Sequence, residues 1–244
     1  INSKEFWDKK DLDDELRRQF DVCHSCRRCF NLCDSFPKLF DLIDDSETME
    51  LDSVDSKHFD KVVDACTLCD MCFMVSCPYV PPHEFAIDIP SLFIRHKAQN
   101  QNKISFVDNL LSKTDKNGRV GLIFNKILNS ITNKKNKLLR IILKAITGIE
   151  VNIRLPKYNS KSFFRKVKSK ALSLRASKEY NNKIIIFSTC YVGYNDSDIG
   201  DALIKVLEKN NIYYEEGYTE CCKMPQIEQG KVEVVKSAAE RTAS

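Results

Sequence analysis

The chain has 244 residues, enough for two small domains and a connector, and a formal net charge of +4. It has eleven cysteines, an odd number, and no run of eighteen apolar residues, so we expect neither a disulfide framework nor a membrane-spanning helix. The charge is segregated: residues 1–96 carry 11 Lys/Arg against 20 Asp/Glu, residues 97–183 carry 21 against 4, and residues 184–244 carry 6 against 10.

The first 96 residues show helical patterns with little strand signal. Acidic residues from Asp11 onward predict a helix that runs into Cys23, and the apolar residues from Phe36 to Ile43 repeat at helical spacing. Ser56 is the predicted N-cap of a third helix, whose apolar face ends at Cys66. These patterns predict an all-α module whose helices lead directly into two cysteine-rich segments.

Eight of the cysteines form two runs with nearly equal spacing. The runs are Cys23-x2-Cys26-x2-Cys29-x3-Cys33 and Cys66-x2-Cys69-x2-Cys72-x4-Cys77, the second followed by Pro78. Three cysteines at two-residue gaps wrap three corners of an iron–sulfur cube, and the distant fourth reaches the other cube. The spacing therefore predicts two [4Fe–4S] clusters. The ligands would be Cys23, Cys26, Cys29 and Cys77 for cluster A, and Cys66, Cys69, Cys72 and Cys33 for cluster B.

Zinc is the main alternative occupant of these runs. Zinc sites take cysteines in pairs, four to a site, and do not need the third closely spaced cysteine of each run. Two details depart from the usual cluster pattern: Asp34 rather than proline follows Cys33, and the last gap of the second run is one residue longer. Because thiolates must stay reduced to bind metal, the cysteine content predicts a cytoplasmic protein.

Residues 97–182 form a basic connector with two amphipathic stretches. Apolar residues mark one face from Val120 to Ile131 and another from Leu139 to Ile146, with a lysine-rich segment between them. One interpretation is a helical hairpin with a solvated lysine face. The other is peripheral contact with the anionic inner face of the cell membrane. We do not expect nucleic acid binding, because the basic residues lack interleaved aromatics and a binding motif.

The pattern changes from Lys183 onward. A short strand at Ile184–Phe187, a helix at Asp198–Lys209 and a second strand at Ile212–Tyr214 predict the beginning of an α/β domain. Cys190 would follow the first strand in a loop, and Cys221 and Cys222 would follow the second. The carboxyl ends of parallel strands are where such folds place their chemistry, so these three cysteines are candidate catalytic residues. Buried cysteines that act as small apolar residues are the alternative.

Three stretches resemble one family of iron–sulfur proteins. The cysteine runs resemble the all-α ferredoxin module of heterodisulfide reductase and of the C subunit of glycerol-3-phosphate dehydrogenase, and residues 147–163 look like the connector of the latter. Residues 187–225 resemble the cysteine-rich CCG domain of the same group, with Cys190, Cys221 and Cys222 at its first three cysteine positions. Lys223 stands where the family has glycine, and the closing Cys-x2-Cys is absent. We therefore expect this domain to be truncated and both chain ends to continue.

The resemblance implies a mainly α chain with a C-terminal α/β piece. Its parts would be a ferredoxin-like domain at 1–96, the basic helical connector at 97–182 and a truncated CCG domain at 183–244. It implies an oxidoreductase subunit that passes electrons from a flavin dehydrogenase partner towards a quinone or a CCG-domain acceptor. No glycine-rich nucleotide motif is present, so the flavin would belong to the partner. The complete CCG domain would offer a site for a further iron–sulfur cluster.

Two alternatives remain open at this stage. One is a heterodisulfide reductase-like enzyme that reduces a disulfide at Cys190, Cys221 and Cys222. The other is a binding module without redox activity, in which metal only stabilises the fold.

Overall fold

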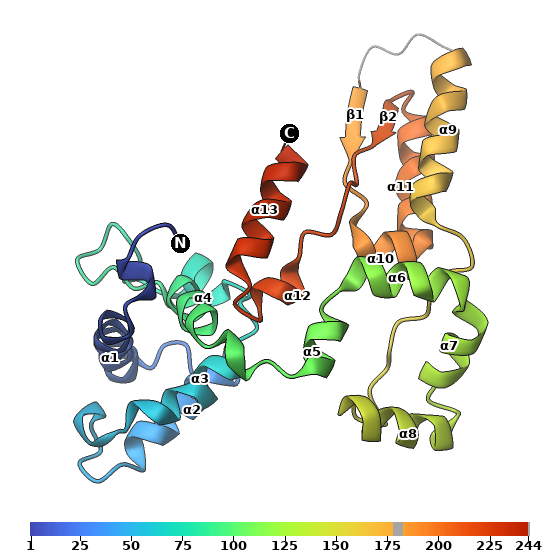
Figure 1. Cartoon of the computed structure of the whole chain (residues 1–244). Coiled ribbons are helices and arrows are strands. Elements are labelled where there is room, and N and C mark those ends of the chain that lie inside the picture. The colour runs from blue at the N-terminus through green and yellow to red at the C-terminus, as the bar shows by residue number, and fades with distance from the viewer. Residues whose placement is uncertain (178–182, 244) are drawn as a thin grey trace. The chain divides into compact units, whose positions relative to one another are not determined.

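The computed structural model describes residues 1–177 and 183–243 and divides into two compact units. Unit 1 comprises Ile1–Ile104 with Gln226–Val234, and unit 2 comprises Ser105–Pro225 with Val235–Ser244. The predicted fold class is confirmed: the described residues are mainly helical, and a small parallel sheet lies in the C-terminal part of the chain (Figure 1). The division into segments 1–96, 97–182 and 183–244 stays a prediction.

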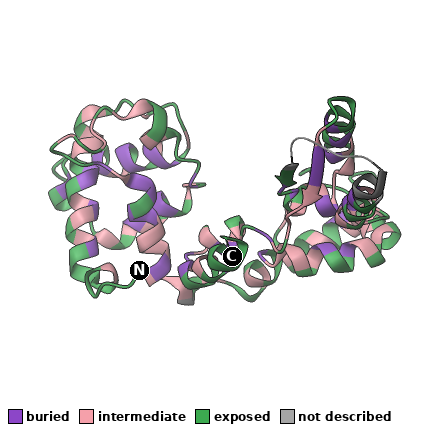
Figure 2. Cartoon of the chain, turned by 90° about the horizontal axis from the view of Figure 1, so that it is seen from above, coloured by how far each residue is buried: buried purple, intermediate pink, exposed green. Residues whose placement is uncertain are grey.

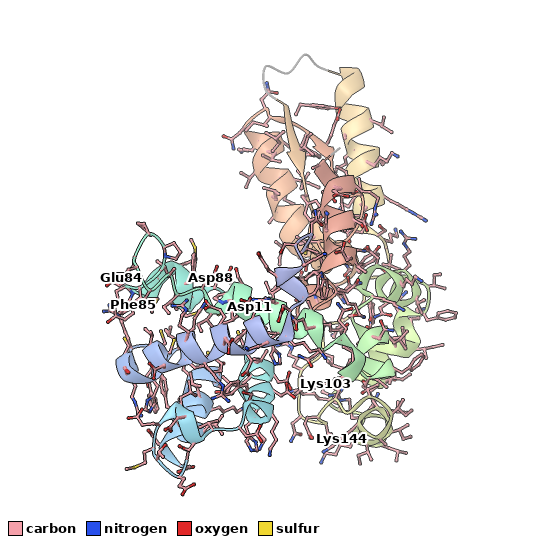
Figure 3. All side chains as sticks on the ribbon, turned by 60° about the vertical axis from the view of Figure 1, so that its left-hand side comes forward. Asp11, Glu84, Phe85, Asp88, Lys103 and Lys144 are labelled. Atoms are coloured by element: carbon pink, nitrogen blue, oxygen red, sulfur yellow. The ribbon has the colours of Figure 1, made fainter. Side chains whose placement is uncertain are left out.

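Unit 1 is built from helices that begin close to their predicted positions. The first helix begins at Lys9, two residues before Asp11, because the Asp8 side chain accepts the N–H groups of Lys10 and Asp11. Asp88, labelled in Figure 3, caps a later helix by accepting the N–H of Ser91 at 3.0 Å. The α-helices are α1 (Lys9–Cys26), α2 (Ser35–Asp44), α3 (Phe59–Asp64) and α4 (Ile89–Gln99). Shorter helical turns are η1 (Glu5–Trp7), η2 (Leu51–Ser53), η3 (Ser56–His58), η4 (Cys72–Ser76) and η5 (Gln101–Lys103).

The predicted cap at Ser56 is wrong by one residue. The carboxylate of Asp55 accepts the N–H of Lys57 at 2.9 Å and so caps η3, the turn that leads into α3. The Ser56 hydroxyl instead accepts a hydrogen bond from the Arg17 guanidinium, which also donates to two backbone carbonyls of the preceding loop. Arg17 on α1 therefore fixes the segment between the two cysteine runs.

The core of unit 1 is formed by the inward faces of α1, α2, α3 and α4. The Phe20 ring makes edge-to-face contacts with Phe59 and Phe93, with ring centroids 5.0 and 5.9 Å apart, and all three residues are buried. Figure 2 shows buried residues in purple along the helices. Cys23 and Cys66 are only partly buried but pack against this core. The cysteine runs therefore lie at the margin of a dry, rigid helical core.

Unit 2 begins with helices and ends with an α/β arrangement. The predicted amphipathic stretch from Val120 to Ile131 is divided between two helices that meet at Phe124. Among the described residues, no helix has the length and apolar content that a membrane span requires. The helices are α5 (Phe106–Leu111), α6 (Thr114–Ile123), α7 (Asn125–Thr132), α8 (Lys137–Thr147), α9 (Phe163–Ser177), α10 (Thr189–Tyr194) and α11 (Ser197–Lys209). Two further helices, α12 (Met224–Ile227) and α13 (Val232–Ala243), have residues in both units.

The sheet of unit 2 consists of β1 (Lys183–Ile186) and β2 (Tyr213–Glu216), paired in parallel with Ile184 opposite Tyr214. A crossover through α10 and α11 connects the strands, as the alternating pattern predicts. Phe163 and Val167 of α9 share a buried cluster with Tyr214. Cys190 lies in the short helix α10 and not in a loop, because the chain turns into a helix soon after β1.

Candidate functional site

The cysteines of the two runs line two hollows in unit 1. Each hollow takes three cysteines from one run and one from the other. Phe36, which is 5 % exposed, lines both hollows and so lies between them. Hollow A is lined by Cys23, Cys26, Cys29 and Cys77, and hollow B by Cys33, Cys66, Cys69 and Cys72. That these quartets bind clusters stays a prediction.

The backbone wraps each hollow through turns that leave helical geometry. The chain leaves α1 at Arg27 in a left-handed backbone conformation, with φ of 51°. In the second run, Leu68 adopts the same left-handed conformation, with φ of 52°. The N–H of Leu68 donates to the Cys66 sulfur at 3.4 Å. Such N–H···S bonds favour the thiolate and tune the potential of a bound cluster. At Leu68, a positive φ that is uncommon for a non-glycine residue therefore accompanies an N–H group that points at the Cys66 sulfur.

The longer last gap of the second run has a structural explanation. Cys72–Ser76 forms a π-helical turn, closed by a hydrogen bond of 2.8 Å from the Cys77 N–H to the Cys72 carbonyl. A π-turn accommodates one residue more than an α-turn. The additional residue is therefore absorbed in the turn, and Cys77 still lines hollow A.

The thiols of the two hollows raise one another's pKa. Burial, followed by the charges of neighbouring cysteines, raises the pKa of Cys29 to about 11 and that of Cys72 to about 12. The same two causes raise the pKa of Cys23 further. These thiols are protonated at neutral pH until a metal displaces their protons. Four soft sulfur donors around one partly buried hollow fit the ligand set of an iron–sulfur cube.

Among the described residues, no group of three or more His, Cys, Asp or Glu side chains is arranged to hold one metal ion. The four thiolates of a cube each bind a different iron atom, so they stand farther apart than the four ligands of one ion.

The three C-terminal cysteines divide into a pair and a single residue. The sulfurs of Cys190 and Cys221 lie 3.6 Å apart; Cys221 is buried, as the apolar alternative predicts, Cys190 is partly buried and Cys222 is exposed. Lys223 adopts a φ of 64°, the left-handed conformation that glycine favours, and its N–H donates to the Cys221 sulfur at 3.4 Å. The lysine therefore takes the backbone shape expected of the glycine that it replaces.

Asp115, in the first turn of α6, organises this pair, and sequence reasoning missed it. Its carboxylate accepts the N–H of Cys221 at 2.8 Å and the hydroxyl of Tyr218, and the Lys223 ammonium lies 3.6 Å away. The signal that could have found it is its charge. Asp115 is one of four acidic residues in the strongly basic segment 97–183.

The contact between the sulfurs of Cys190 and Cys221 shifts the pKa values of the two thiols in opposite directions. The hydrogen bond between the two sulfurs is the largest cause that lowers the pKa of Cys221, and the same bond raises the pKa of Cys190. The pair therefore releases its first proton more readily than an isolated thiol does and holds its second more tightly. Burial, and then the neighbouring Asp115 carboxylate, raises the pKa of Tyr218, which stays a hydrogen-bond donor.

Comparison with known proteins gives partial matches. No family model matches the chain. Over 131 residues it is 32% identical to the C subunit of anaerobic glycerol-3-phosphate dehydrogenase from Escherichia coli strain K12, and equally to the protein of the same name from Escherichia coli O157:H7. The match covers 53% of this chain and 32% of each relative, so it spans about a third of the length of these curated relatives. No solved structure matches.

Proposed function

We propose that this chain is an electron-transfer iron–sulfur subunit with a [4Fe–4S] cluster in each of hollows A and B. The observation that carries the proposal is the exchange of the fourth ligand, with Cys77 in hollow A and Cys33 in hollow B. The similarity to the C subunit of an anaerobic glycerol-3-phosphate dehydrogenase supports it. When bound, such clusters accept and release single electrons.

The residues of unit 1 would hold the clusters and exclude water from them. Val22, Phe40 and Ile87 give hollow A apolar walls, and Ile89 and Pro90 do the same for hollow B. Apolar walls and N–H···S bonds are the means by which a protein sets a cluster's potential.

The donor would be a flavin dehydrogenase on another polypeptide, and the acceptor a quinone or the C-terminal cysteine pair. This part of the proposal has two supports. The chain has no glycine-rich nucleotide motif of its own, and the relatives are named as subunits of a dehydrogenase.

Anaerobic reconstitution tests the proposal. We expect the chain to bind about eight iron atoms, as two cubes require, and to show reducible cluster signals in electron paramagnetic resonance. Binding of no more than about four irons, or stoichiometric zinc, would be incompatible with two cubes. Clusters that bind but cannot be reduced would instead favour the metal-stabilised module.

The cysteine pair of unit 2 favours a second function, reduction of a substrate disulfide. The Cys221 thiolate would attack one substrate sulfur and release the other as a thiolate. Cys190 would then displace the bound half, leaving a Cys190–Cys221 disulfide and two substrate thiols. The separation of 3.6 Å between the two sulfurs is the observation that favours this function. It predicts that Cys221→Ser abolishes turnover and leaves the iron content unchanged.

Peripheral membrane contact is a third part of the proposal. Ile127 on α7 and Ile142 and Ile146, one turn apart on α8, have exposed fractions of 61%, 48% and 67%. The same helices and the segment between them also carry Lys126, Lys134, Lys135 and Lys137, whereas Lys144, labelled in Figure 3, pairs with Glu150 at 2.7 Å. Apolar side chains surrounded by lysine suit an anionic lipid surface.

Vesicle sedimentation tests the membrane contact. We expect binding to vesicles that contain phosphatidylglycerol, and weaker binding for Ile146→Glu. Leu172→Glu on α9 is the matched control, because it places the same charge on an exposed residue outside this surface. Equal loss in both variants, or no vesicle binding by the wild-type chain, would exclude this surface as the contact.

A further inference from the structure

Unit 2 contains a third hollow whose charged lining is entirely basic. It has a volume of about 1360 Å³ and opens to solvent. Its cations come from α6, from the loop before α9 and from α9 itself: Arg119, Lys161, Arg165 and Lys166. Among the described residues that line it there is no Asp or Glu. We call it the cationic hollow.

The positive charge of the cationic hollow is only partly neutralised. Lys166 pairs with the Asp201 carboxylate at 2.5 Å, and Arg119 hydrogen-bonds the Tyr194 hydroxyl. Within residues 1–177 and 183–243, no ion pair involves Lys161 or Arg165. Two of the four cations therefore line the hollow without a carboxylate partner among the described residues, which raises the local affinity for an anion.

The uncharged polar lining also consists mostly of hydrogen-bond donors. It includes the hydroxyl side chains of Ser160, Ser162, Ser197 and Thr219. Ser162 directly precedes α9, a helix of 15 residues, and Ser197 is the first residue of α11, a helix of 13 residues. The positive end of the α9 dipole thus adds to the cations at the hollow, whereas Asp196 and Asp198 flank Ser197 and offset the dipole of α11.

We propose that the cationic hollow binds a small molecule that carries phosphate groups. A phosphate presents several acceptor oxygens and up to two negative charges, which suits several cations and hydroxyls better than a single carboxylate does. Leu122 and Ile123 line the same hollow, and the Ile123 side chain is 72% exposed, so an apolar part of the ligand has a surface to cover. This site uses no residue of hollows A and B and does not depend on the proposed electron transfer.

Isothermal titration of the full chain with inorganic pyrophosphate at fixed ionic strength tests the site. We expect saturable binding with one molecule per chain. Arg165→Ala should weaken it by about tenfold or more, the effect of losing one charge-assisted hydrogen bond. Lys168→Ala is the matched control, because Lys168 lies on the same helix, is exposed and does not line the hollow. It should change the affinity by less than about twofold, since surface charges act weakly.

Two outcomes would overturn the site: no saturable binding by the wild-type chain, or equal weakening by Arg165→Ala and Lys168→Ala, which indicates diffuse surface charge. If Arg165→Ala fails to fold by circular dichroism, Lys161→Ala is the replacement, with the same expected loss. Iron content is measured on the same samples. Pyrophosphate binding without iron would separate this site from the electron-transfer proposal.

Discussion

The two units of this protein place cysteines in different surroundings. In unit 1, thiols face other thiols and apolar walls, and burial and mutual repulsion raise the pKa of Cys23, Cys29 and Cys72. In unit 2, Cys221 lies among hydrogen-bond partners, and the hydrogen bond with Cys190 lowers its pKa. A metal that binds thiols with raised pKa values must displace their protons, whereas a thiol with a lowered pKa loses its proton more readily by itself.

The different pKa values and neighbours of these cysteines mean that the number of cysteines alone does not define a functional site. The residues around each sulfur decide whether it is suited to bind metal or to react. Substitutions in either unit test this difference, and the one with the largest expected effect lies in unit 1.

Replacing Cys77, the proposed ligand that the second run contributes to hollow A, should have the largest effect. In Cys77→Ser, hollow A keeps three thiols, so we expect the iron content to fall from about eight to about four atoms per chain. The measurement is iron and sulfide analysis after anaerobic reconstitution, with Cys222→Ser as the control. Full iron content with both cluster signals intact in Cys77→Ser would exclude Cys77 as a ligand.

Unit 2 should be sensitive to packing around α10, which carries Cys190. A Cβ atom on Gly193 would lie 1.8 Å from the Phe164 ring, and that ring stacks on Tyr218 with centroids 4.2 Å apart. We expect Gly193→Ala to destabilise unit 2 by about 2–3 kcal/mol, the usual cost of overpacking. Urea unfolding measures it. Gly148→Ala, where nothing lies within 4 Å and only the φ of 75° is strained, should cost about 1 kcal/mol.

Removing the hydrogen bond between Cys190 and Cys221 should have a smaller effect, on the reactivity of Cys221. Cys190→Ala removes the hydrogen bond that is the largest cause lowering the pKa of Cys221, so this pKa should rise towards the usual thiol value. Because Cys221 is buried, its alkylation rate also depends on access, so the expected result is an upward displacement of the pH midpoint of its alkylation. Mass spectrometry measures the rate, and the exposed Cys222 in the same chain is the internal reference. An unchanged midpoint would mean that the sulfur contact does not set the pKa.

The sequence was most informative where function depends on local spacing. The cysteine runs and the helices that lead into them are visible because each loop wraps its own three sulfurs. The strand–helix–strand order from Lys183 onward was predictable from alternating strand-like and helix-like patterns. Asp115 was not, because it contacts Cys221 across 106 positions of sequence, and no spacing rule connects them. The position of Cys190 on a helix was also missed, since the six residues of α10 are too few for a periodic pattern.

Lys223 shows why a departure from a pattern can mislead. The replacement of glycine suggests a lost close approach, yet the backbone adopts the glycine-like conformation at φ of 64°. A non-glycine residue in this conformation costs about 1–2 kcal/mol. Its side chain supplies compensating contacts, with the ammonium 3.0 Å from Glu220 and 3.6 Å from Asp115.

The smallest expected effect follows from that ion pair. Hydrogen bonds from Arg241, the largest cause, and from Lys223 lower the pKa of Glu220 from 4.5 to about 2. A carboxyl whose folded pKa is depressed stabilises the fold above its unfolded pKa and loses that contribution as the pH falls through the folded value. Glu220→Gln should therefore lower the stability of unit 2 by about 1 kcal/mol or less near neutral pH, as near-surface pairs do. The difference should shrink between pH 4.5 and about pH 2. Urea midpoints of both chains at a series of pH values measure it, and a difference that stays constant with pH would show that the ion pairs contribute nothing.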